Sequence, residues 1–380
     1  MKYLVLVKGD GRGHLTQALA LAELLTARGH HVCAFVVGKP AQANLPAFFA
    51  QRAQAPVVPL ESPNFRLTRN RKRIAWGRTL VQGLLHLPAY RRSVRQLHTL
   101  LCTHHPDVIV NLYEPLATLH RWLYGRTRAR VVHISHQALL LHPAFEFPAG
   151  GGLSRRLVVG YTRFVNRSAD KSLALSFYPL PPAAGLGQVV VAPLLRQAVF
   201  DHTPSAGGHI LAYMVYPGFA DTLLAFAQRH PEVPVVAFWN NPEAPATRQL
   251  APNLVVHQVN DTLFLEHLAS CRGVATTAGF ETVAEALYYG KPAILMPMPG
   301  QYEQTLNAHD AQRVGAGVPV TALDPEQLLA FEPHYRPETE AYRRWLAEGS
   351  ERLIFHLENP AAHPEARPSA PKLQQPSLVL

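Results

Sequence analysis

Two short segments combine residue types that could bind a phosphorylated substrate and move a proton. The first, "GDGRGHLTQA" at residues 9–18, places a histidine after a glycine-rich turn, and the second, "TTAGFETVAE" at residues 276–285, combines a glycine with hydroxyls and carboxylates. Backbone amides at a helix start can hydrogen-bond a diphosphate, and the helix dipole favours its charge. The same dipole disfavours a protonated imidazole, so a histidine placed there is a base near neutral pH.

The glycine turn does not match the common nucleotide-binding motifs. Gly9 and Gly11 fit G-x-G-x-x-G, but the third position is His14, and the next strand ends in "VVGKP" without a carboxylate for a ribose. The sequence has no G-x-x-x-x-G-K-[ST] either, so we exclude NAD and P-loop sites. Two interpretations remain for Gly11, Arg12, Gly13 and His14. Either the turn delivers His14 to a ligand as a general base, or it only begins a helix.

Short β-branched runs alternate with helical patterns along both halves of the chain. In the first half the pattern predicts helices from His14, from about Thr79 and from Pro115, and strands at residues 3–7, 31–37, 108–111, 131–135 and 173–177. In the second half it predicts strands at residues 210–215, 235–239, 254–259, 274–277 and 293–298, with helices between them. We therefore predict an α/β protein with two successive parallel sheets, which place ligands at the carboxyl ends of their strands.

The domain boundaries follow from the same pattern. We place an N-terminal domain at residues 1–199, a linker at 200–209, a C-terminal domain at 210–332 and C-terminal helices that cross back to the first domain at 333–358. Residues 359–380 are rich in Pro and Ala with few residues for a core, so we expect a disordered tail.

Charge is distributed unevenly along the chain. Residues 1–200 hold 25 Lys and Arg against 7 Asp and Glu, a net charge of +18, whereas residues 201–380 hold 11 against 19, a net charge of −8. A basic half can meet nucleic acid, an anionic membrane or a phosphorylated substrate, and the count does not choose among them.

Cysteine usage and hydropathy indicate a cytoplasmic protein. Cys33, Cys102 and Cys271 are widely spaced and form no C-x-x-C, so we interpret them as reduced packing residues. No apolar stretch approaches the roughly 18 residues of a membrane span, and Met1 leads directly into a predicted strand without a signal peptide.

The segment "TTAGFETVAEALYYGKPAILMPMPGQYEQTLNA", at residues 276–308, resembles the donor-binding signature of GT-B fold glycosyltransferases. It is similar both to UDP-glycosyltransferases and to the N-acetylglucosaminyltransferases that make the lipid-linked peptidoglycan precursor. The pattern H-x-G-x-x-[ST]-x-x-E falls on Thr277, Gly279, Thr282 and Glu285, with Phe280 and Glu281 inside it, and the later motif falls on Gly300, Glu303, Gln304 and Asn307. The resemblance implies two Rossmann-like domains whose parallel sheets face a cleft, with these residues binding a nucleotide sugar, most simply a UDP-sugar.

The glycine turn resembles the G-G-H turn of the lipid-precursor enzymes, which implies that His14 is the catalytic base of an inverting transfer to a hydroxyl acceptor. In related enzymes an aspartate orients this histidine, but here the matching region reads "VIVNLYEPLA". Glu114 is our substitute, and the alternative is that it only caps the helix from Pro115. Thr277 stands where the related families have a histidine or an arginine, so amides and hydroxyls must bind more of the diphosphate.

Several other readings of the sequence are open. One basic segment contains Arg69, Arg71, Lys72 and Arg73, and it fits either an anionic lipid surface or a solvated loop. The first alternative implies a peripheral membrane protein with a lipid-linked acceptor. We predict no metal site, since D-x-D is absent and the H-x-x-H at His133 would point to both faces of a strand. The alternative functions are a sugar-nucleotide epimerase or hydrolase on the same fold, and a non-catalytic nucleotide-sugar or nucleic-acid binding protein. Nucleic acid is the weaker of these ligands, because the sequence contains no recognisable nucleic-acid binding module.

Overall fold

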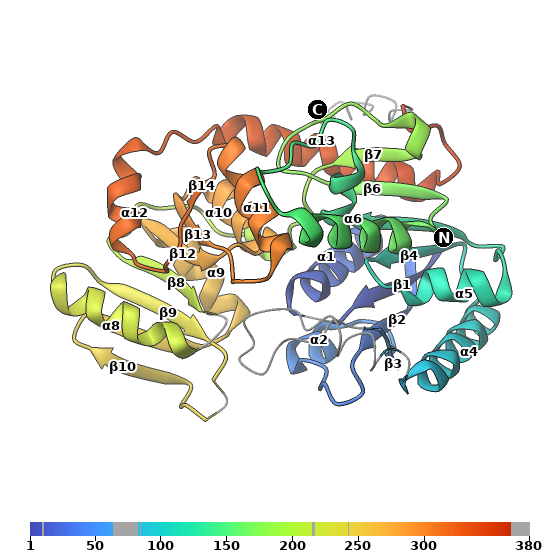
Figure 1. The fold of residues 1–380 in the computed structure, drawn as a ribbon, viewed down its shortest axis with the longest axis horizontal. Coiled ribbons are helices and arrows are strands. Elements are labelled where there is room, and N and C mark those ends of the chain that lie inside the picture. Colours follow the sequence, from blue (N-terminus) through green and yellow to red (C-terminus); the bar gives the residue numbers. More distant parts are fainter. Residues whose placement is uncertain (10, 64–82, 84, 215–216, 242, 366–380) are drawn as a thin grey trace, which may run out of the picture.

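The computed structural model describes residues 1–9, 11–63, 83, 85–214, 217–241 and 243–365, and it contains two seven-stranded sheets (Figure 1). The first sheet contains β1 (Lys2–Lys8), β2 (His31–Lys39), β3 (Val57–Glu61), β4 (Val108–Leu112), β5 (Arg130–Ser135), β6 (Lys171–Leu175) and β7 (Gln188–Val191). The second contains β8 (Ile210–Met214), β9 (Val235–Trp239), β10 (Thr247–Ala251), β11 (Leu254–Gln258), β12 (Gly273–Thr277), β13 (Ala293–Met296) and β14 (Gly317–Pro319).

Helices separate the strands along the chain. Those before β8 are α1 (Gly13–Ala27), α2 (Ala47–Arg52), α4 (Leu87–His104), α5 (Leu116–Tyr124), η1 (Gln137–Leu141), α6 (Gly152–Asn166), η2 (Ala184–Leu186) and α7 (Gln197–Phe200). Those after β8 are η3 (Pro217–Phe219), α8 (Ala220–Arg229), α9 (Asp261–Ser270), α10 (Phe280–Tyr289), α11 (Tyr302–Arg313), α12 (Glu326–Phe331), η4 (Glu332–His334) and α13 (Thr339–Glu358).

The two sheets have the doubly wound topology that the sequence predicts. Their strand orders are β3-β2-β1-β4-β5-β6-β7 and β10-β11-β9-β8-β12-β13-β14. All described strand pairs are parallel except β10 with β11 at one edge. In such sheets the strand order reverses next to the central strand, and the loops at the carboxyl ends of β1 and β12 lie at that point. The prediction of an α/β protein with two successive parallel sheets is confirmed.

The predicted strands are present, with ends that differ by a few residues. The largest shift is at β6, which covers residues 171–175 where we predicted 173–177. Four strands were not predicted: β3, β7, β10 and β14. Among the starting points predicted for helices, Thr79 lies outside the described residues, and α4 begins at Leu87.

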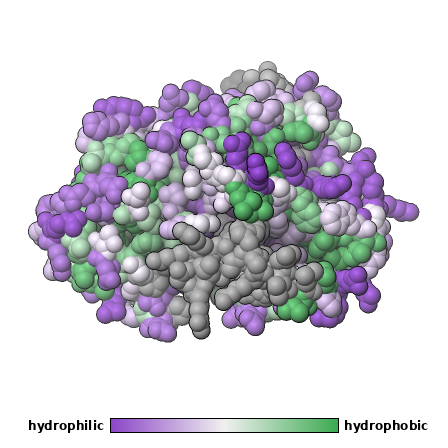
Figure 2. Space-filling view, viewed as in Figure 1, coloured by the Kyte–Doolittle hydropathy of each residue, from purple (hydrophilic) through white to green (hydrophobic). Residues whose placement is uncertain are grey.

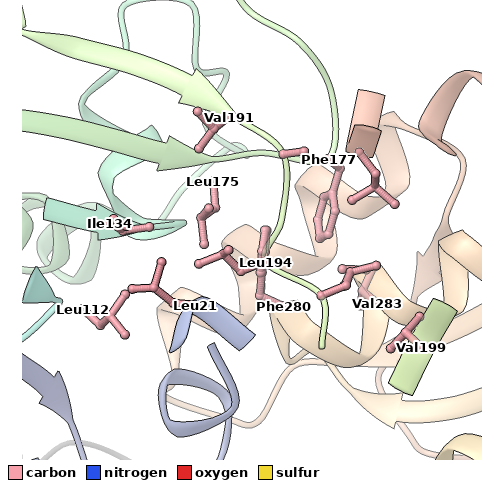
Figure 3. Close-up of a cluster of buried hydrophobic side chains, with 14 of the residues drawn as sticks. Leu21, Leu112, Ile134, Leu175, Phe177, Val191, Leu194, Val199, Phe280 and Val283 are labelled. Atoms are coloured by element: carbon pink, nitrogen blue, oxygen red, sulfur yellow. The ribbon is translucent and has the colours of Figure 1, made fainter. Parts of the chain in front are cut away.

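One hydrophobic core joins the two sheets. Figure 3 shows that side chains from the first half, such as Leu175 and Phe177, lie beside Phe280 and Val283 of α10, and all four belong to the same buried cluster. Because this cluster is continuous, the elements that carry the two sequence motifs are packed against each other.

Helix α13 also ties the C-terminal end of the described chain to the first sheet. The Trp345 indole donates to the carbonyl oxygen of Ser176 at 2.9 Å, and the Tyr3 hydroxyl donates to the carbonyl oxygen of Leu357 at 3.2 Å. Gly349 allows this close approach, since a Cβ at this position would lie 2.6 Å from the backbone nitrogen of Ala192.

We predict that Gly349→Ala destabilises the protein by about 1–3 kcal/mol, because backbone must move to admit one methyl group. The matched control is Gly160→Ala in α6, where a Cβ would meet no atom within 4 Å. That control should be neutral or stabilising by up to about 1 kcal/mol, since alanine favours a helix. Urea unfolding measures both changes, and equal stability of the two variants would contradict this account of α13.

Candidate active site

His14 lies in the first turn of α1, directly after the glycine turn at the end of β1. Gly11 has a φ of 80°, which favours glycine, and Gly9 donates to the carbonyl oxygen of Gly38 at 2.7 Å, where a side chain would collide with Val37. The turn therefore needs its glycines to bring α1 back over the sheet. The imidazole of His14 is stacked on the ring of Tyr113, which directly follows β4, and the ring centroids are 5.9 Å apart.

The carboxylate that lies next to His14 comes from the second half of the chain. Gln137 Nε2 lies 3.3 Å from His14 Nε2 and donates to Glu303 Oε1 at 2.9 Å. The imidazole of His136 lies 3.2 Å from the same carboxylate oxygen. Glu303 is the second residue of α11, and its side chain is 41% exposed, so it remains open to a ligand.

In these surroundings the imidazole of His14 is neutral and the carboxylate of Glu303 is ionised. Burial lowers the pKa of His14 to about 3, although the charge of Glu303 opposes the shift, so the imidazole is neutral at pH 7. Burial also opposes ionisation of Glu303, but the interaction with His136 and the nearby charge of Lys8 lower its pKa to about 2. A neutral base thus lies close to an ionised carboxylate.

Glu114, which we predicted as the carboxylate that orients His14, makes other contacts in the structure. Its carboxylate accepts hydrogen bonds from the Ser62 hydroxyl and from the backbone amide of Leu116 at 3.1 Å, and it packs closely against Gly38. These contacts match the alternative interpretation of Glu114 as a residue that caps the start of α5. The contacts of His14 favour Glu303 over Glu114 as the neighbouring carboxylate.

The glycine turn faces the start of α10. Gln17 of α1 donates to Glu281 Oε1 at 2.6 Å, and a Cβ at Gly13 would lie 3.6 Å from Glu281 Cγ. Burial raises the pKa of Glu281 to about 8, against the hydrogen bond from Gln17, so this carboxyl group is mostly protonated at pH 7.

The first turn of α10 offers free amides to an anion. Gly279 is the residue before α10, and no side chain within the described part of the chain caps this helix. By contrast, Asn260 caps α9 by accepting from the amides of Thr262 and Leu263. Thr277 ends β12 and is 3% exposed, and Thr282 is partly buried in the first turn of α10. The predicted diphosphate-binding segment therefore has the expected strand–turn–helix geometry.

Three other predicted donor-site side chains make contacts that hold the site together. Glu285 is 2% exposed, and its Oε1 accepts from Arg196 at 2.8 and 2.9 Å. Gln304 accepts from the amide of Met298 at 2.8 Å, and Asn307 donates to the carbonyl oxygen of Ala278 at 3.1 Å. Gly300, with a φ of 78°, forms the turn into α11.

Sequence reasoning did not identify four residues that the structure brings to this site. Gln137 and His136 follow the carboxyl end of β5, and that position was the signal that could have found them. Arg196 is a single arginine in the apolar segment "VVVAPLLRQAVF". Asp261, at the start of α9, forms a salt bridge with Arg12 at 2.5 Å, and its carboxylate lies 3.9 Å from the guanidinium of Arg196.

A metal site is not found in the part of the chain that the structure describes, where no group of three or more His, Cys, Asp or Glu could hold an ion. His133 is buried, and its Nε2 lies 2.9 Å from the Ser135 hydroxyl. In the same described residues, no helix is both long and apolar enough to cross a membrane. Arg69, Arg71, Lys72 and Arg73 lie outside the described residues.

Comparison with known proteins identifies the family. A UDP-N-acetylglucosamine–N-acetylmuramyl-(pentapeptide) pyrophosphoryl-undecaprenol N-acetylglucosamine transferase of Acidothermus cellulolyticus is 27% identical over 347 residues, 83% of this chain and 84% of that protein. Among solved structures, the glycotransferase of kitacinnamycin has a TM-score of 0.63 at 21% identity, covering 94% of this chain and 98% of its own. LpCGTa in complex with UDP has a TM-score of 0.60 at 15% identity, covering 96% of this chain and 99% of its own.

These structures share the GT-B fold that the sequence predicts, with two facing α/β units. The model of glycosyl transferase family 1 matches residues 1–333, which is most of the chain. The chain therefore belongs to glycosyl transferase family 1, and it is a glycosyltransferase.

Proposed function

We propose that the protein is an inverting glycosyltransferase that moves a sugar from a UDP-sugar to a hydroxyl acceptor, with His14 as the general base. The observation that carries this proposal is the position of neutral His14 beside Glu303, which lies in the first turn of α11 in the other half of the molecule. Support for a uridine nucleotide comes from the UDP named with one structural neighbour and from the UDP-sugar named for the relative in Acidothermus cellulolyticus.

The proposed reaction is a single displacement. The acceptor oxygen forms a bond to the anomeric carbon while the bond from that carbon to the β-phosphate oxygen breaks, and the electron pair leaves with UDP. His14 takes the acceptor proton. Amides in the first turn of α10 and its positive dipole end stabilise the departing diphosphate, a role that requires no metal ion.

Sugar recognition falls to Glu303 in this proposal. An ionised carboxylate only accepts hydrogen bonds, so it binds sugar hydroxyls as donors. Its open side chain lies within the same group of contacts as His14. The anomeric carbon of a sugar held by Glu303 would therefore be near the base.

An anionic membrane surface is a second element of the proposal, and it points to a lipid-linked acceptor. Residues 87–167 contain 11 Arg and no Lys, against Asp107, Glu114 and Glu146. On α5 three apolar side chains are exposed, Trp122, Leu123 and Tyr124, and Figure 2 shows apolar surface around α4 and α5 beside hydrophilic side chains. Exposed apolar residues that are flanked by arginine fit an anionic lipid surface.

We predict that His14→Ala lowers kcat by about 10²- to 10⁴-fold and leaves donor affinity nearly unchanged, because a base acts only as the reaction proceeds. His334→Ala, at an exposed histidine in η4, is the control.

The pH dependence of the wild type gives a separate test of the base. Because the pKa of His14 is about 3, protonation of this base should not reduce kcat/KM of the wild type between pH 7.5 and 5.5. A base with the ordinary pKa near 6.5 would lose roughly tenfold over that range. Full activity of His14→Ala would return His14 to a structural role.

We predict that UDP binds with Thr282 as one of its hydrogen-bond donors, so Thr282→Val should weaken binding by about 10-fold or more. Thr262→Val is the matched control, since Thr262 occupies the first turn of α9, whose amides Asn260 already caps. Calorimetry with UDP, repeated in EDTA, measures both variants. Equal weakening in the two variants, or loss of UDP binding in EDTA, would contradict the proposed donor site.

We predict that the wild-type protein sediments with vesicles of mixed anionic and zwitterionic lipid, and that added salt releases it. Leu123→Glu should reduce this binding several-fold, since it places a carboxylate at the apolar centre of the surface. Leu186→Glu is the control, because Leu186 is 55% exposed in η2, outside α4 and α5. Binding that is absent at low salt would leave a soluble acceptor as the better interpretation.

A further inference from the structure

The side chain of Gln137 lies between the proposed base and the carboxylate beside it. Gln137 begins η1 directly after β5, and it is 1% exposed. Its Nε2 atom is 2.9 Å from Glu303 Oε1 and 3.3 Å from His14 Nε2. One amide nitrogen therefore contacts both side chains.

Glu303 determines which way this amide is oriented. An ionised carboxylate can only accept hydrogen bonds, so the amide atom beside Glu303 Oε1 must be the nitrogen with its two hydrogens. The opposite orientation would place the amide oxygen against a carboxylate oxygen at the same 2.9 Å, where the two would repel. Because this nitrogen has no lone pair to offer, it is a donor toward His14 as well.

We infer that Gln137 is a positioning residue that fixes the tautomer of His14 with its proton on Nδ1 and its lone pair on Nε2; this inference rests on the proposed role of His14 as base. A neutral imidazole has one protonated and one unprotonated nitrogen, and the amide hydrogen selects the unprotonated one. In related enzymes an aspartate orients the catalytic histidine. Here an uncharged amide, itself oriented by Glu303, performs that task.

This arrangement identifies the atom that takes the proton. An acceptor hydroxyl displaces the amide from His14 Nε2 and donates its hydrogen to the same lone pair. When the sugar is transferred, Nε2 gains the proton while Nδ1 keeps its own. The imidazolium that forms lies near the charge of Glu303, which favours it.

The arrangement also couples the base to the contact between the two halves of the molecule. His14 and Gln137 belong to the first half of the chain, whereas Glu303 belongs to α11 of the second half. Glu303 can orient the amide only when the halves are packed together as in this structure. The tautomer of His14 therefore depends on the contact between the two halves.

Nuclear magnetic resonance of ¹⁵N-histidine-labelled protein tests the inference without any substrate. The nitrogen shifts of His14, assigned by their loss in His14→Ala, should show a protonated Nδ1 in the wild type. Gln137→Leu, which keeps the size and removes the amide, should move His14 toward protonation on Nε2. Gln188→Leu is the matched control, because Gln188 is another buried glutamine whose amide donates to the carbonyl oxygen of Ala138 at 2.8 Å, and it should leave the His14 signal unchanged.

Steady-state kinetics give the second readout. Gln137→Leu should lower kcat by about 10²- to 10⁴-fold, the range expected for a misplaced or wrongly protonated base, while the donor KM changes less than about threefold. An unchanged His14 tautomer in Gln137→Leu overturns the inference, whatever the activity. A changed tautomer with unchanged kcat overturns the positioning role. Full activity of His14→Ala is a separate result that would overturn the proposed function, and the tautomer measurement would still stand.

Discussion

The packing of Phe280 between two rings of the first half is the interaction on which the site depends. Phe280 is the first residue of α10, and its ring is stacked on His136 and on Phe177, each with centroids 4.5 Å apart. His136 and Phe177 lie just after β5 and β6. Each aromatic pair contributes about 0.5–1.5 kcal/mol beyond its buried area. The same contact holds His136 within reach of Glu303, so the hydrophobic core sets the position of the polar groups.

Two glutamates of the cleft differ in charge because their surroundings differ. Burial raises the pKa of Glu281 to about 8, and its carboxyl group accepts a hydrogen bond from the uncharged amide of Gln17. Glu303 has the imidazole of His136 and the nearby charge of Lys8, and its pKa is lowered to about 2. Such a separation of pKa values between two acids divides their chemical roles. Here the protonated group packs against the glycine turn, and the side chain of the ionised group is partly exposed.

The sequence was sufficient for the strands at the centre of each sheet and insufficient for those at the edges. Strands such as β1 and β13 are buried on both faces and consist largely of continuous apolar runs. The four strands that were not predicted are short, and β3 and β14 contain Pro59 and Pro319. Proline weakens a strand signal and is tolerated mainly at a sheet edge, where β3 and β14 lie.

The candidate site was predictable only where its residues are close in sequence. His14 belongs to one short motif, and Glu285 and Glu303 belong to another. The contact of Gln137 with Glu303 joins residues 166 positions apart, and that of Arg196 with Glu285 joins residues 89 apart. Neither pair has a local pattern, because both depend on how the two halves pack. A pairing of this kind can be derived from a structure and not from the spacing of residues in one sequence.

The uneven charge of the chain has a partial explanation within the molecule itself. Arg12, Arg52 and Arg196 come from the basic half and surround Asp261 of the acidic half, at distances of 2.5, 3.7 and 3.9 Å. Arg196 also pairs with Glu285, and this second pair is buried, with side chains 7% and 2% exposed. Removing either partner would leave an uncompensated buried charge, so Arg196 and Glu285 must stay paired where the two halves meet. Part of the charge difference between the halves therefore serves their mutual contact.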